Sequence, residues 1–531
     1  MNNHILLIET IKKQLNFEPT RQQKELIDLL ALFCCMPTET KAFILKGFAG
    51  TGKTSIVSGL IMAMKRLGQN TVLLAPTGRA AKVLSNYSNH SAYSIHKVIY
   101  RQKSAGDFTF NLNYNSHKNT LFIVDEASMI ANQSGSGVEF GSGRLLDDLV
   151  EYVYSGDNCS MILVGDTAQL LPIGQSSSPA LNKNIIEGYG LEVIEYQLTQ
   201  VIRQAGESGI LFNATKIRQA IEKEPFIPIK LNPNFDDVKV VSGENLVEEL
   251  ETSYSQVGEE NAIILTYSNK RAVLYNRGVR GQVMMKEDEL STGDYLIITK
   301  NNYYWSKPYD NLDFIANGDI AEIIRVGKHY ELYGARFADL TLRLIDYDVE
   351  ITARILIDSL YTETPSAQNA LNERLVNTIA EDYAEITNKR QFWQEMQKNE
   401  FYNALQVKFA YAITGHKSQG GSWDHVYIDQ GYITEEMITK EYYQWLYTAI
   451  TRAKEKVFLV NFSKYASKDC GRYKRIKYEK WKQLKDADSW EIKFTDSHAH
   501  EDCLYSIDDI TIRVIKGDPA ADIPDCIRFS F

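Results

Sequence analysis

The chain has 531 residues, of which 44% are hydrophobic and 24% are charged, a composition ordinary for folded globular protein. No apolar run reaches the ~20 residues that a membrane-crossing helix needs, and the six cysteines lack the CxxC spacing of zinc sites, so we expect reduced thiols and a cytoplasmic location. The net charge of −10 neither supports nor excludes a nucleic-acid partner, because basic residues can be confined to one channel.

The first 200 residues alternate short apolar runs with helical stretches. Residues 1–17 are typical of a short amphipathic helix and lack the basic start and cleavage site of a targeting signal. Each apolar run ends in turn or polar residues. The runs are AFILKGFAG (42–50), TVLLAPTG (71–78), TLFIVDEAS (120–128) and CSMILVGD (159–166). This alternation predicts a parallel sheet wound with helices.

The rest of the sequence predicts a second α/β unit that is interrupted by an insertion. Its apolar runs are NAIILTYSN (261–269), VKFAYAITG (407–415), DHVYID (424–429) and KVFLVNF (456–462). Short alternating segments at 285–360 predict a small antiparallel barrel, and 364–404 has a helical pattern. We expect a first domain at 1–200, a second at 201–284 and 405–465, an inserted domain at 285–404 and an extension at 466–531.

Residues 47–54, GFAGTGKT, follow the first apolar run and open a helical segment. In such a loop, glycines let backbone N–H groups approach phosphate, and the helix N-terminus supplies partial positive charge. Lys53 is suited to the β- and γ-phosphate oxygens, and the Thr54 hydroxyl to Mg²⁺. An ordinary glycine turn is a poor alternative in this strand–loop–helix context. The predicted nucleotide contacts are Gly47, Gly50, Thr51, Gly52, Lys53, Thr54 and Ser55.

Three polar residues at the ends of later apolar runs complete the predicted catalytic set. Asp125 is expected to hold Mg²⁺ through its water shell, and Glu126 to polarise the attacking water. Alone, such a pair is usually a solvated strand end or a helix cap, but it lies downstream of a phosphate loop. Gln169 offers both a donor and an acceptor for sensing the γ-phosphate, with an ordinary loop amide as the alternative.

Eight segments together resemble the ordered motifs of superfamily 1 helicases, specifically the RecD-like and Dda-like branch. They are GFAGTGKT, APTGRAAKVL, SIHK, VDEAS, GDTAQLLPIG, LTQVIRQ, AITGHKSQGGSWDHVYID and LYTAITRAK, and the resemblance covers residues 17–462. It implies an α/β fold of two tandem RecA-like domains with ATP in the cleft between them. It also implies an inserted small β-hairpin and an SH3-like β-barrel with a helical subdomain.

The resemblance assigns further nucleotide contacts. Gln23 in PTRQQ matches the adenine-reading glutamine, with the adjacent Gln22 as the competing position. Arg203 and Arg452 match the arginines that reach the γ-phosphate from the second domain. Two guanidinium groups that arrive when the cleft closes would stabilise the charge of phosphoryl transfer.

Two groups of residues match the contacts of this family with single-stranded DNA. Small hydroxyls, backbone amides and a few cations suit a phosphate track that is read without sequence preference. A structural role is the alternative for His416. The first group is Pro76, Thr77, Gly78, Arg79, Ser94, His96 and Lys97, and the second is Thr414, His416, Lys417, Ser418 and Gln419.

Residues 97–120 lie where this branch carries a strand-separating hairpin. The alternating FTFNLNY fits a hairpin, and Phe108 or Phe110 is predicted to stack on the last base pair. Packing of both rings within the protein is the alternative. The Gly- and Ser-rich loop 130–144 has no assigned role. The basic segment 471–485 is a helix candidate for DNA or partner binding, or a charged surface helix.

These features predict an ATP- and Mg²⁺-dependent DNA helicase that moves 5′ to 3′ on single-stranded DNA and acts at single-strand/duplex junctions. The expected setting is replication, recombination or repair, with protein partners from those processes, no membrane, and a monomeric state. One alternative is a translocating ATPase that remodels protein–DNA complexes without processive unwinding. A GTPase is disfavoured because Asn269-Lys270-Arg271-Ala272 lacks the guanine-reading aspartate, and a non-enzymatic scaffold because the catalytic set is intact.

Overall fold

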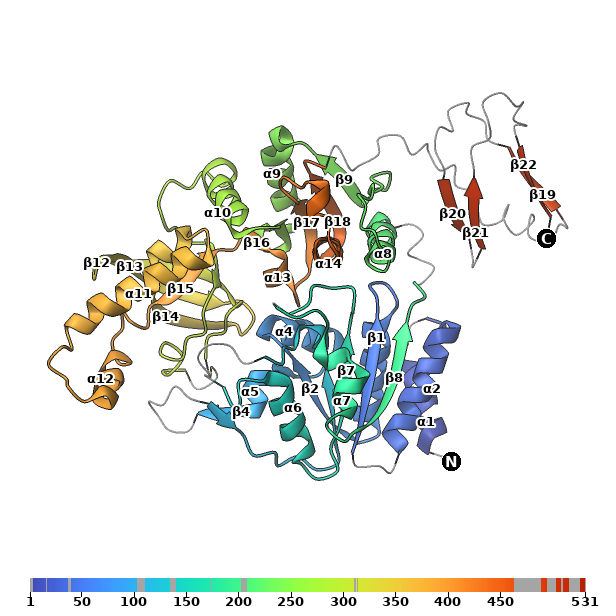
Figure 1. The fold of residues 1–531 in the computed structure, drawn as a ribbon, viewed down its shortest axis with the longest axis horizontal. Coiled ribbons are helices and arrows are strands. Elements are labelled where there is room, and N and C mark those ends of the chain that lie inside the picture. The colour runs from blue at the N-terminus through green and yellow to red at the C-terminus, as the bar shows by residue number, and fades with distance from the viewer. Residues whose placement is uncertain are drawn as a thin grey trace. The chain divides into compact units, whose positions relative to one another are not determined.

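The computed structural model describes residues 3–15, 17–36, 40–102, 110–133, 140–172, 174–201, 208–309, 312 and 314–462, together with four strands between 489 and 530 (Figure 1). The chain divides into two compact units, Met1–Ala466 and Ser467–Phe531. In the part of the chain that the structure describes, no helix is long and apolar enough to cross a membrane. Cys34, Cys35 and Cys159 are free thiols.

The first sheet of the larger unit has six strands, all parallel, in the order β3-β2-β6-β7-β1-β8. Its strands are β1 (Lys41–Gly47), β2 (Asn70–Ala75), β3 (Ala92–Ser94), β6 (Thr120–Val124), β7 (Ser160–Gly165) and β8 (Glu192–Leu198). Its helices are α1 (Asn3–Gln14), α2 (Arg21–Cys35), α3 (Lys53–Arg66), α4 (Gly78–Ser88), α5 (Ile95–Ile99), α6 (Leu145–Tyr154) and α7 (Lys183–Glu187).

Helices cover both faces of this sheet because successive strand residues point to opposite sides. In β1, Phe43 and Leu45 join the core under α1, α2 and α3, whereas Ala42 and Ile44 join the core under α5, α6 and α7. This accounts for the continuous apolar runs in the sequence. All four predicted strands are present, and β3 and β8 extend the sheet at its edges.

The second sheet has five parallel strands in the order β16-β10-β17-β18-β9. Its strands are β9 (Val238–Val241), β10 (Ala262–Thr266), β16 (Ala412–Thr414), β17 (Trp423–Asp429) and β18 (Ala453–Val460). Its helices are α8 (Gly209–Ile221), α9 (Leu246–Val257), α10 (Asn269–Gly278), α13 (Gly415–Ser418) and α14 (Lys440–Ile450). The two sheets together give the α/β fold that the sequence predicted.

A closed barrel lies between β10 and β16 in the sequence. Its strands are β11 (Tyr295–Ile298), β12 (Ile320–Leu332), β13 (Ala335–Leu344), β14 (Val349–Leu356) and β15 (Leu405–Phe409). The helices α11 (Pro365–Glu381) and α12 (Lys389–Met396) precede β15, and apolar residues of both helices share a small core with the barrel.

The barrel corrects two expectations. Residues 405–409, assigned above to the second α/β domain, close the barrel as β15. The barrel is also not wholly antiparallel, because β15 is antiparallel to β11 but parallel to β14. A closed barrel with an odd number of strands cannot alternate direction throughout, so the fifth strand forces one parallel pair.

The predicted hairpin is present as β4 (Tyr100–Gln102) and β5 (Phe110–Leu112), which pair antiparallel. The smaller unit contains two antiparallel strand pairs. These are β19 (Ser489–Lys493) with β22 (Cys526–Ser530), and β20 (Cys503–Ile507) with β21 (Ile510–Val514). The helix candidate at 471–485 lies outside the described residues.

Candidate nucleotide and nucleic-acid site between the two sheets

The phosphate loop joins the end of β1 to the start of α3. Gly50 and Gly52 have φ values of +75° and +83°, in the left-handed region that favours glycine. The Lys53 ammonium donates to the carbonyl oxygens of Gly47 and Phe48, the latter at 3.1 Å. Thr54 and Ser55 are exposed on the first turn of α3. The loop therefore combines a helix N-terminus, a lysine and two solvent-exposed hydroxyl groups, which together fit a triphosphate.

Carboxylates lie at the ends of the neighbouring strands β6 and β7. Asp125 accepts hydrogen bonds from the Tyr87 hydroxyl at 2.5 Å and from the Glu126 backbone N–H at 2.9 Å. Burial, and then the negative charge of Glu126, raises the pKa of Asp125. Asp166 follows β7, and its Oδ2 lies 4.0 Å from the Lys53 Nζ. The site thus presents buried acids beside one lysine, an arrangement that a cation would stabilise.

The residues fit a magnesium ion better than a protein-caged metal. The described residues hold no group of three or more His, Cys, Asp or Glu side chains that could bind a metal. Mg²⁺ in phosphoryl-transfer sites takes one or two protein oxygens and completes its shell with phosphates and water. Thr54, on the first turn of α3, and Asp125, directly after β6, are oxygen ligands of that kind.

Both candidate adenine-reading glutamines are engaged in hydrogen bonds. Gln23 is buried, donates to the Thr51 carbonyl at 3.0 Å and forms a capping box with Thr20 at the start of α2. The Gln22 amide oxygen accepts the backbone N–H groups of Thr199 and Gln200. Gln23 therefore ties α2 to the phosphate loop, and Gln22 ties α2 to the segment after β8.

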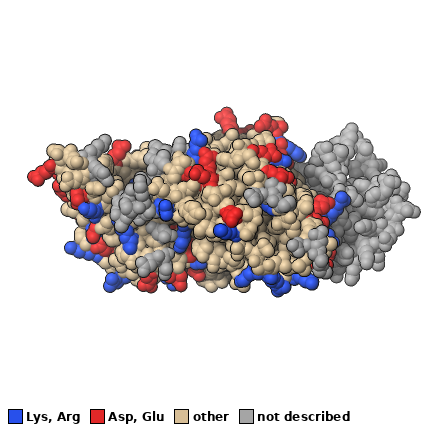
Figure 2. Space-filling model, turned by 90° about the horizontal axis from the view of Figure 1, so that it is seen from below, with Lys and Arg blue, Asp and Glu red and all other residues tan. Residues whose placement is uncertain are grey.

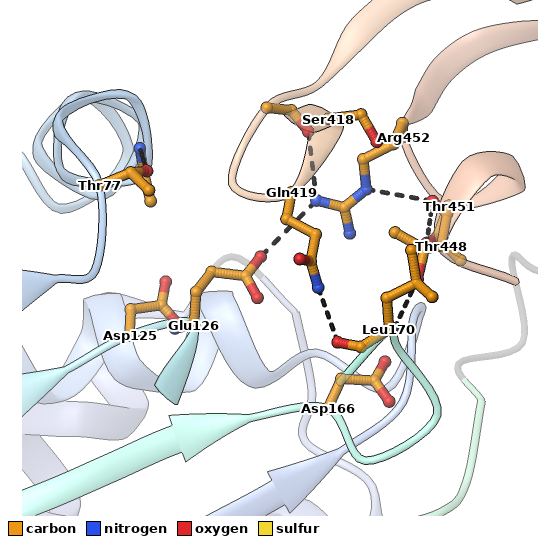
Figure 3. Close-up of polar contacts among 12 residues, drawn as sticks. Thr77, Asp125, Glu126, Asp166, Leu170, Ser418, Gln419, Thr448, Thr451 and Arg452 are labelled. Atoms are coloured by element: carbon orange, nitrogen blue, oxygen red, sulfur yellow. Dashed lines mark hydrogen bonds and ion pairs between the residues drawn. The ribbon is translucent and has the colours of Figure 1, made fainter. Parts of the chain in front are cut away.

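Arg452 reaches this site from the second sheet (Figure 3). Its Nη1 lies 3.7 Å from the Glu126 Oε1, and the side chain is only 7% exposed. The guanidinium is held by the carbonyl oxygens of Thr448 and Gly421, each at 3.2 Å. The structure thus brings Arg452 close to Glu126, whereas Arg203 lies outside the described residues. The predicted contact of both arginines with the γ-phosphate stays a prediction.

The loop after β7 is held from both sides by the second sheet. The Leu170 backbone N–H donates to the Thr448 hydroxyl at 2.9 Å, and the Leu170 carbonyl accepts from the Gln419 amide at 2.7 Å (Figure 3). Gln169 is buried beside this contact, and its Oε1 has no hydrogen-bond partner among the described residues. This amide oxygen can accept a hydrogen bond from water but not from an ionised phosphate oxygen, and the predicted sensing of the γ-phosphate by Gln169 stays a prediction.

The predicted DNA contacts from the two sheets meet at the N-termini of α4 and α13. Thr77 caps α4 by accepting the Ala80 N–H at 3.1 Å, and a side chain at Gly420 would collide with Ala80. The Arg79 guanidinium stacks over Trp423 at 4.1 Å, which spans the two sheets. Pro76 and Gly78 flank Thr77 on the same turn. Half-buried cations at this seam fit a narrow phosphate track.

The α13 residues differ in how far they are available to a ligand. Ser418 is fully buried and donates to the Gly415 carbonyl, and Gln419 points to Leu170 rather than to solvent. Thr414, His416 and Lys417 are partly exposed. Burial lowers the pKa of His416, and it lowers the pKa of Lys417 to about 8. Figure 2 shows acidic and basic side chains interspersed on one face, without a continuous basic stripe.

An aromatic cluster joins the hairpin to the barrel. The Phe110 ring is 7% exposed and lies 4.9 Å from Phe140 and 4.8 Å from Tyr303, with Phe314 beside them. His96 packs against Phe140 at 4.9 Å, and burial lowers its pKa to about 4. Phe110 thus packs within the protein in this structure, as in the alternative to base stacking. Phe140, from the Gly- and Ser-rich loop, belongs to the same aromatic cluster.

The remaining predicted contacts flank that cluster. Ser94 caps α5 by accepting the Lys97 N–H at 3.4 Å, and the Lys97 ammonium lies over the ring of Tyr93. Phe108 lies outside the described residues.

A turn of the barrel covers the start of α4. A side chain at Gly78 would meet the Tyr347 hydroxyl at 2.3 Å, and Lys82 donates to the Ile345 carbonyl. The positive charges of Arg79 and Lys82 act on Asp346 in this turn. Asp319 lies beneath the turn, and burial raises its pKa to about 7. Acidic groups of the barrel thus stand beside the predicted DNA contacts.

Both halves of the chain that meet at this site match families of known proteins. Residues 22–223 match the model of an AAA domain, and residues 409–460 match the UvrD-like helicase C-terminal domain. The chain is 25% identical over 463 residues to "ATP-dependent DNA helicase dda" of Enterobacteria phage T4, covering 78% of this chain and 93% of that protein. The chain is a DNA helicase and ATPase, and its two halves resemble those of the superfamily 1 helicases.

Two further relatives differ in how much of their own length the chain covers. It is 24% identical over 494 residues to "Uncharacterized protein R530" of Acanthamoeba polyphaga mimivirus, covering 78% of this chain and 94% of that protein. It is 24% identical over 428 residues to "ATP-dependent RecD2 DNA helicase" of Deinococcus radiodurans, covering 78% of this chain but 46% of the relative.

Three side chains of the helicase site were not singled out from the sequence. Asp166 lies within the quoted motif GDTAQLLPIG, and its position directly after a buried strand, like that of Asp125, was an available signal. Tyr87 on α4 and Tyr447 on α14 reach the site through their hydroxyls. A tyrosine inside an amphipathic helix gives no sequence signal of such a contact.

Proposed function

We propose that this helicase is an ATP-driven motor that moves 5′ to 3′ along single-stranded DNA and separates duplex at single-strand junctions. The observation that carries the proposal is the approach of Arg452, from the second sheet, to Glu126 at the end of β6. Hydrolysis in such a shared site depends on the closed arrangement of both sheets. The names of the RecD2 and dda relatives support the DNA substrate.

The residues divide the chemistry among themselves. Lys53 and the loop N–H groups hold the β- and γ-phosphates, and Glu126 orients and polarises the attacking water. Thr54, and Asp125 through water, would hold Mg²⁺, which would supply charge neutralisation at the phosphates. Arg452 stabilises charge that develops on the γ-phosphate oxygens. The predicted role of Gln169 is to sense the γ-phosphate, and Arg203 is assigned a role matching that of Arg452 by the family pattern.

The contacts at Leu170 and Trp423 explain how hydrolysis would move DNA. Gln419 and Thr448 hold Leu170, and Arg79 stacks on Trp423, so opening the cleft must separate the tracks at α4 and α13. Each track grips phosphates with few cations, which allows release at every step. Alternating closure and opening then gives one-way stepping.

Lys53→Ala tests the ATPase, and we expect turnover to be abolished while the melting temperature and single-stranded DNA binding stay near wild type. Direction is tested with paired 5′-tailed and 3′-tailed duplexes and ATP. Unwinding of the 3′-tailed duplex alone would overturn the proposed polarity.

The burial of Phe110 favours a second candidate function, a translocase that remodels protein–DNA complexes without processive unwinding. In that case streptavidin would be displaced from biotinylated single strands while neither duplex opens.

A further inference from the structure

One tyrosine hydroxyl links the phosphate loop to the second sheet. Tyr447 lies on α14, and its side chain is 1% exposed. The hydroxyl accepts the backbone N–H of Ala49 at 2.8 Å and donates to the Asp166 Oδ2 at 2.7 Å. Ala49 belongs to the phosphate loop and Asp166 follows β7, so both partners are on the first sheet.

The ring and the hydroxyl of Tyr447 make their contacts with different α/β domains. The ring packs in the core of the second sheet with residues of α8 and β17, whereas the hydroxyl crosses to the first sheet. Burial, and then the charge of Asp166, raises the pKa of the phenol, so the group keeps its proton and remains a donor. Asp166 in turn lies 4.0 Å from the Lys53 ammonium. The hydroxyl is therefore one residue removed from the lysine that meets phosphate.

The same helix carries the groups that act on the other side of the site. Thr448 holds the Leu170 N–H, and its carbonyl accepts a hydrogen bond from the Arg452 Nε. A change at Ala49 or Lys53 must alter the Tyr447 hydrogen bonds, and α14 transmits that change one turn onward to Arg452. Packed elements of this kind have discrete arrangements rather than a continuum.

We propose that Tyr447 is a positioning residue that couples the state of the phosphate loop to the placement of Arg452 and of the second DNA track. The inference rests on the proposed function, because it concerns the same ATP site. The Tyr447 hydroxyl contacts Ala49 and Asp166. It sets the position of groups proposed to contact the reacting atoms.

The test compares Tyr447→Phe with Tyr427→Phe, in the full chain. Tyr427 is a matched control because its side chain is as buried as that of Tyr447. The Tyr427 hydroxyl makes hydrogen bonds with Ser253 and Glu249, which both belong to the second α/β domain and are far from the phosphate loop in the sequence. Three quantities are measured: kcat and KM for ATP with saturating single-stranded DNA, the DNA Kd with and without a non-hydrolysable ATP analogue, and nucleotide-induced hydrogen-exchange protection of α14.

For Tyr447→Phe we expect kcat to fall about 10-fold or more, since a hydrogen bond to a charged group carries energy of that order. KM should change less than kcat. The analogue should no longer change the DNA Kd or protect α14. Tyr427→Phe should keep the wild-type coupling even where its melting temperature is lowered.

Two results would overturn the inference: Tyr447→Phe retaining wild-type kcat and coupling, or the two variants losing coupling equally, which would indicate a merely structural role. Failure of the proposed function has a different signature, namely a wild-type chain without DNA-stimulated ATP turnover. In that case, the hydrogen-exchange protection of α14 by the analogue still tests Tyr447. Loss of this protection in Tyr447→Phe, but not in Tyr427→Phe, supports the inference. Equal protection of α14 in the two variants contradicts it.

Discussion

At the scale of single residues, Arg452 is the clearest case of a charge whose partner lies in a distant part of the chain. It is held by two carbonyl oxygens of its own domain and lies 3.7 Å from Glu126. We expect Arg452→Ala to lower the DNA-stimulated kcat by about 10³-fold, the order found when an arginine that stabilises phosphoryl transfer is removed. Arg343→Ala, which removes an exposed barrel arginine paired with Glu322, should leave kcat unchanged.

Steady-state ATPase measurements at saturating DNA decide this prediction. A variant that keeps kcat but raises KM would show that Arg452 binds the ground state rather than the transition state. Arg452→Lys adds a graded comparison, because lysine keeps the charge but cannot hold two carbonyl oxygens with a planar fork.

Asp319 gives the chain a pH-dependent stability. It accepts hydrogen bonds from the Ala316 N–H at 2.7 Å and the Tyr347 hydroxyl at 3.3 Å, yet burial, and to a smaller extent the charge of Asp346, raises its pKa to about 7. An aspartate in the unfolded chain has a pKa of roughly 3.9. Between these values the folded chain binds more protons than the unfolded chain, so its stability falls as pH rises.

The contribution of Asp319 is therefore fully present below about pH 4 and lost as pH passes about 7, with a slope of at most roughly 1.4 kcal/mol per pH unit. Chemical denaturation of wild type and Asp319→Asn at pH 5.5 and 8 measures it. We expect the variant to gain stability relative to wild type at pH 8. A gap between the two chains that does not change with pH would contradict the assignment.

At the scale of elements, the turn between β13 and β14 stands against the start of α4. Asp346 is beside Lys82 and Arg79, of which Arg79 is a predicted DNA contact, and its buried Oδ2 lacks a hydrogen-bond partner among the described residues. We expect Asp346→Asn to tighten single-stranded DNA binding several-fold at low salt, because one competing negative charge is removed. The exposed barrel residue Glu350 provides the control, as Glu350→Gln.

Fluorescence anisotropy at two salt concentrations measures both variants. The gain should shrink at high salt, since exposed charge interactions are screened. An equal gain in Glu350→Gln would indicate a general effect of net charge instead of the turn.

The hairpin and the barrel are joined through the aromatic cluster around Phe110. From this contact we expect that a substitution in the cluster affects duplex unwinding and ATP turnover differently. Phe110→Ala removes ring contacts with Phe140 and Tyr303 and should lower duplex unwinding while single-stranded DNA-stimulated ATP turnover is retained. Phe392→Ala on α12 is the matched control. Equal loss of both activities would show that the cluster supports the fold of the ATPase.

Elements whose residues act locally could be predicted from the sequence, and those that depend on distant partners could not. The strands β1, β2, β6 and β7 carry continuous apolar runs that end in motif residues, and these features are local. The short strand β9 has too few residues for a clear period. β15 reads as a buried strand in either domain, and only its pairing with β11 and β14 places it in the barrel.

The same distinction holds within the site. Lys53, Asp125 and Glu126 follow from loop and strand-end chemistry. The roles of Gln419, whose amide holds Leu170, and of Tyr447 depend on residues more than 200 positions away in the sequence. Phe110 alternates correctly for a strand, but its burial depends on Tyr303 and Phe314 of the barrel.

At the scale of the whole molecule, the residues proposed to bind nucleotide and DNA lie within Met1–Ala466, apart from the candidate segment 471–485, and Ser467–Phe531 forms a separate compact unit. We expect a chain ending at residue 466 to fold, because the cores of both sheets and of the barrel are complete within it. It should retain single-stranded DNA-stimulated ATP turnover at the full-length value. Circular dichroism, thermal unfolding and steady-state turnover measure this, with the Lys53→Ala form of the same shortened chain as the background for contaminating ATPase. Weaker DNA binding at unchanged kcat would place a DNA contact in the smaller unit, and loss of a cooperative thermal transition would contradict the division into independent units.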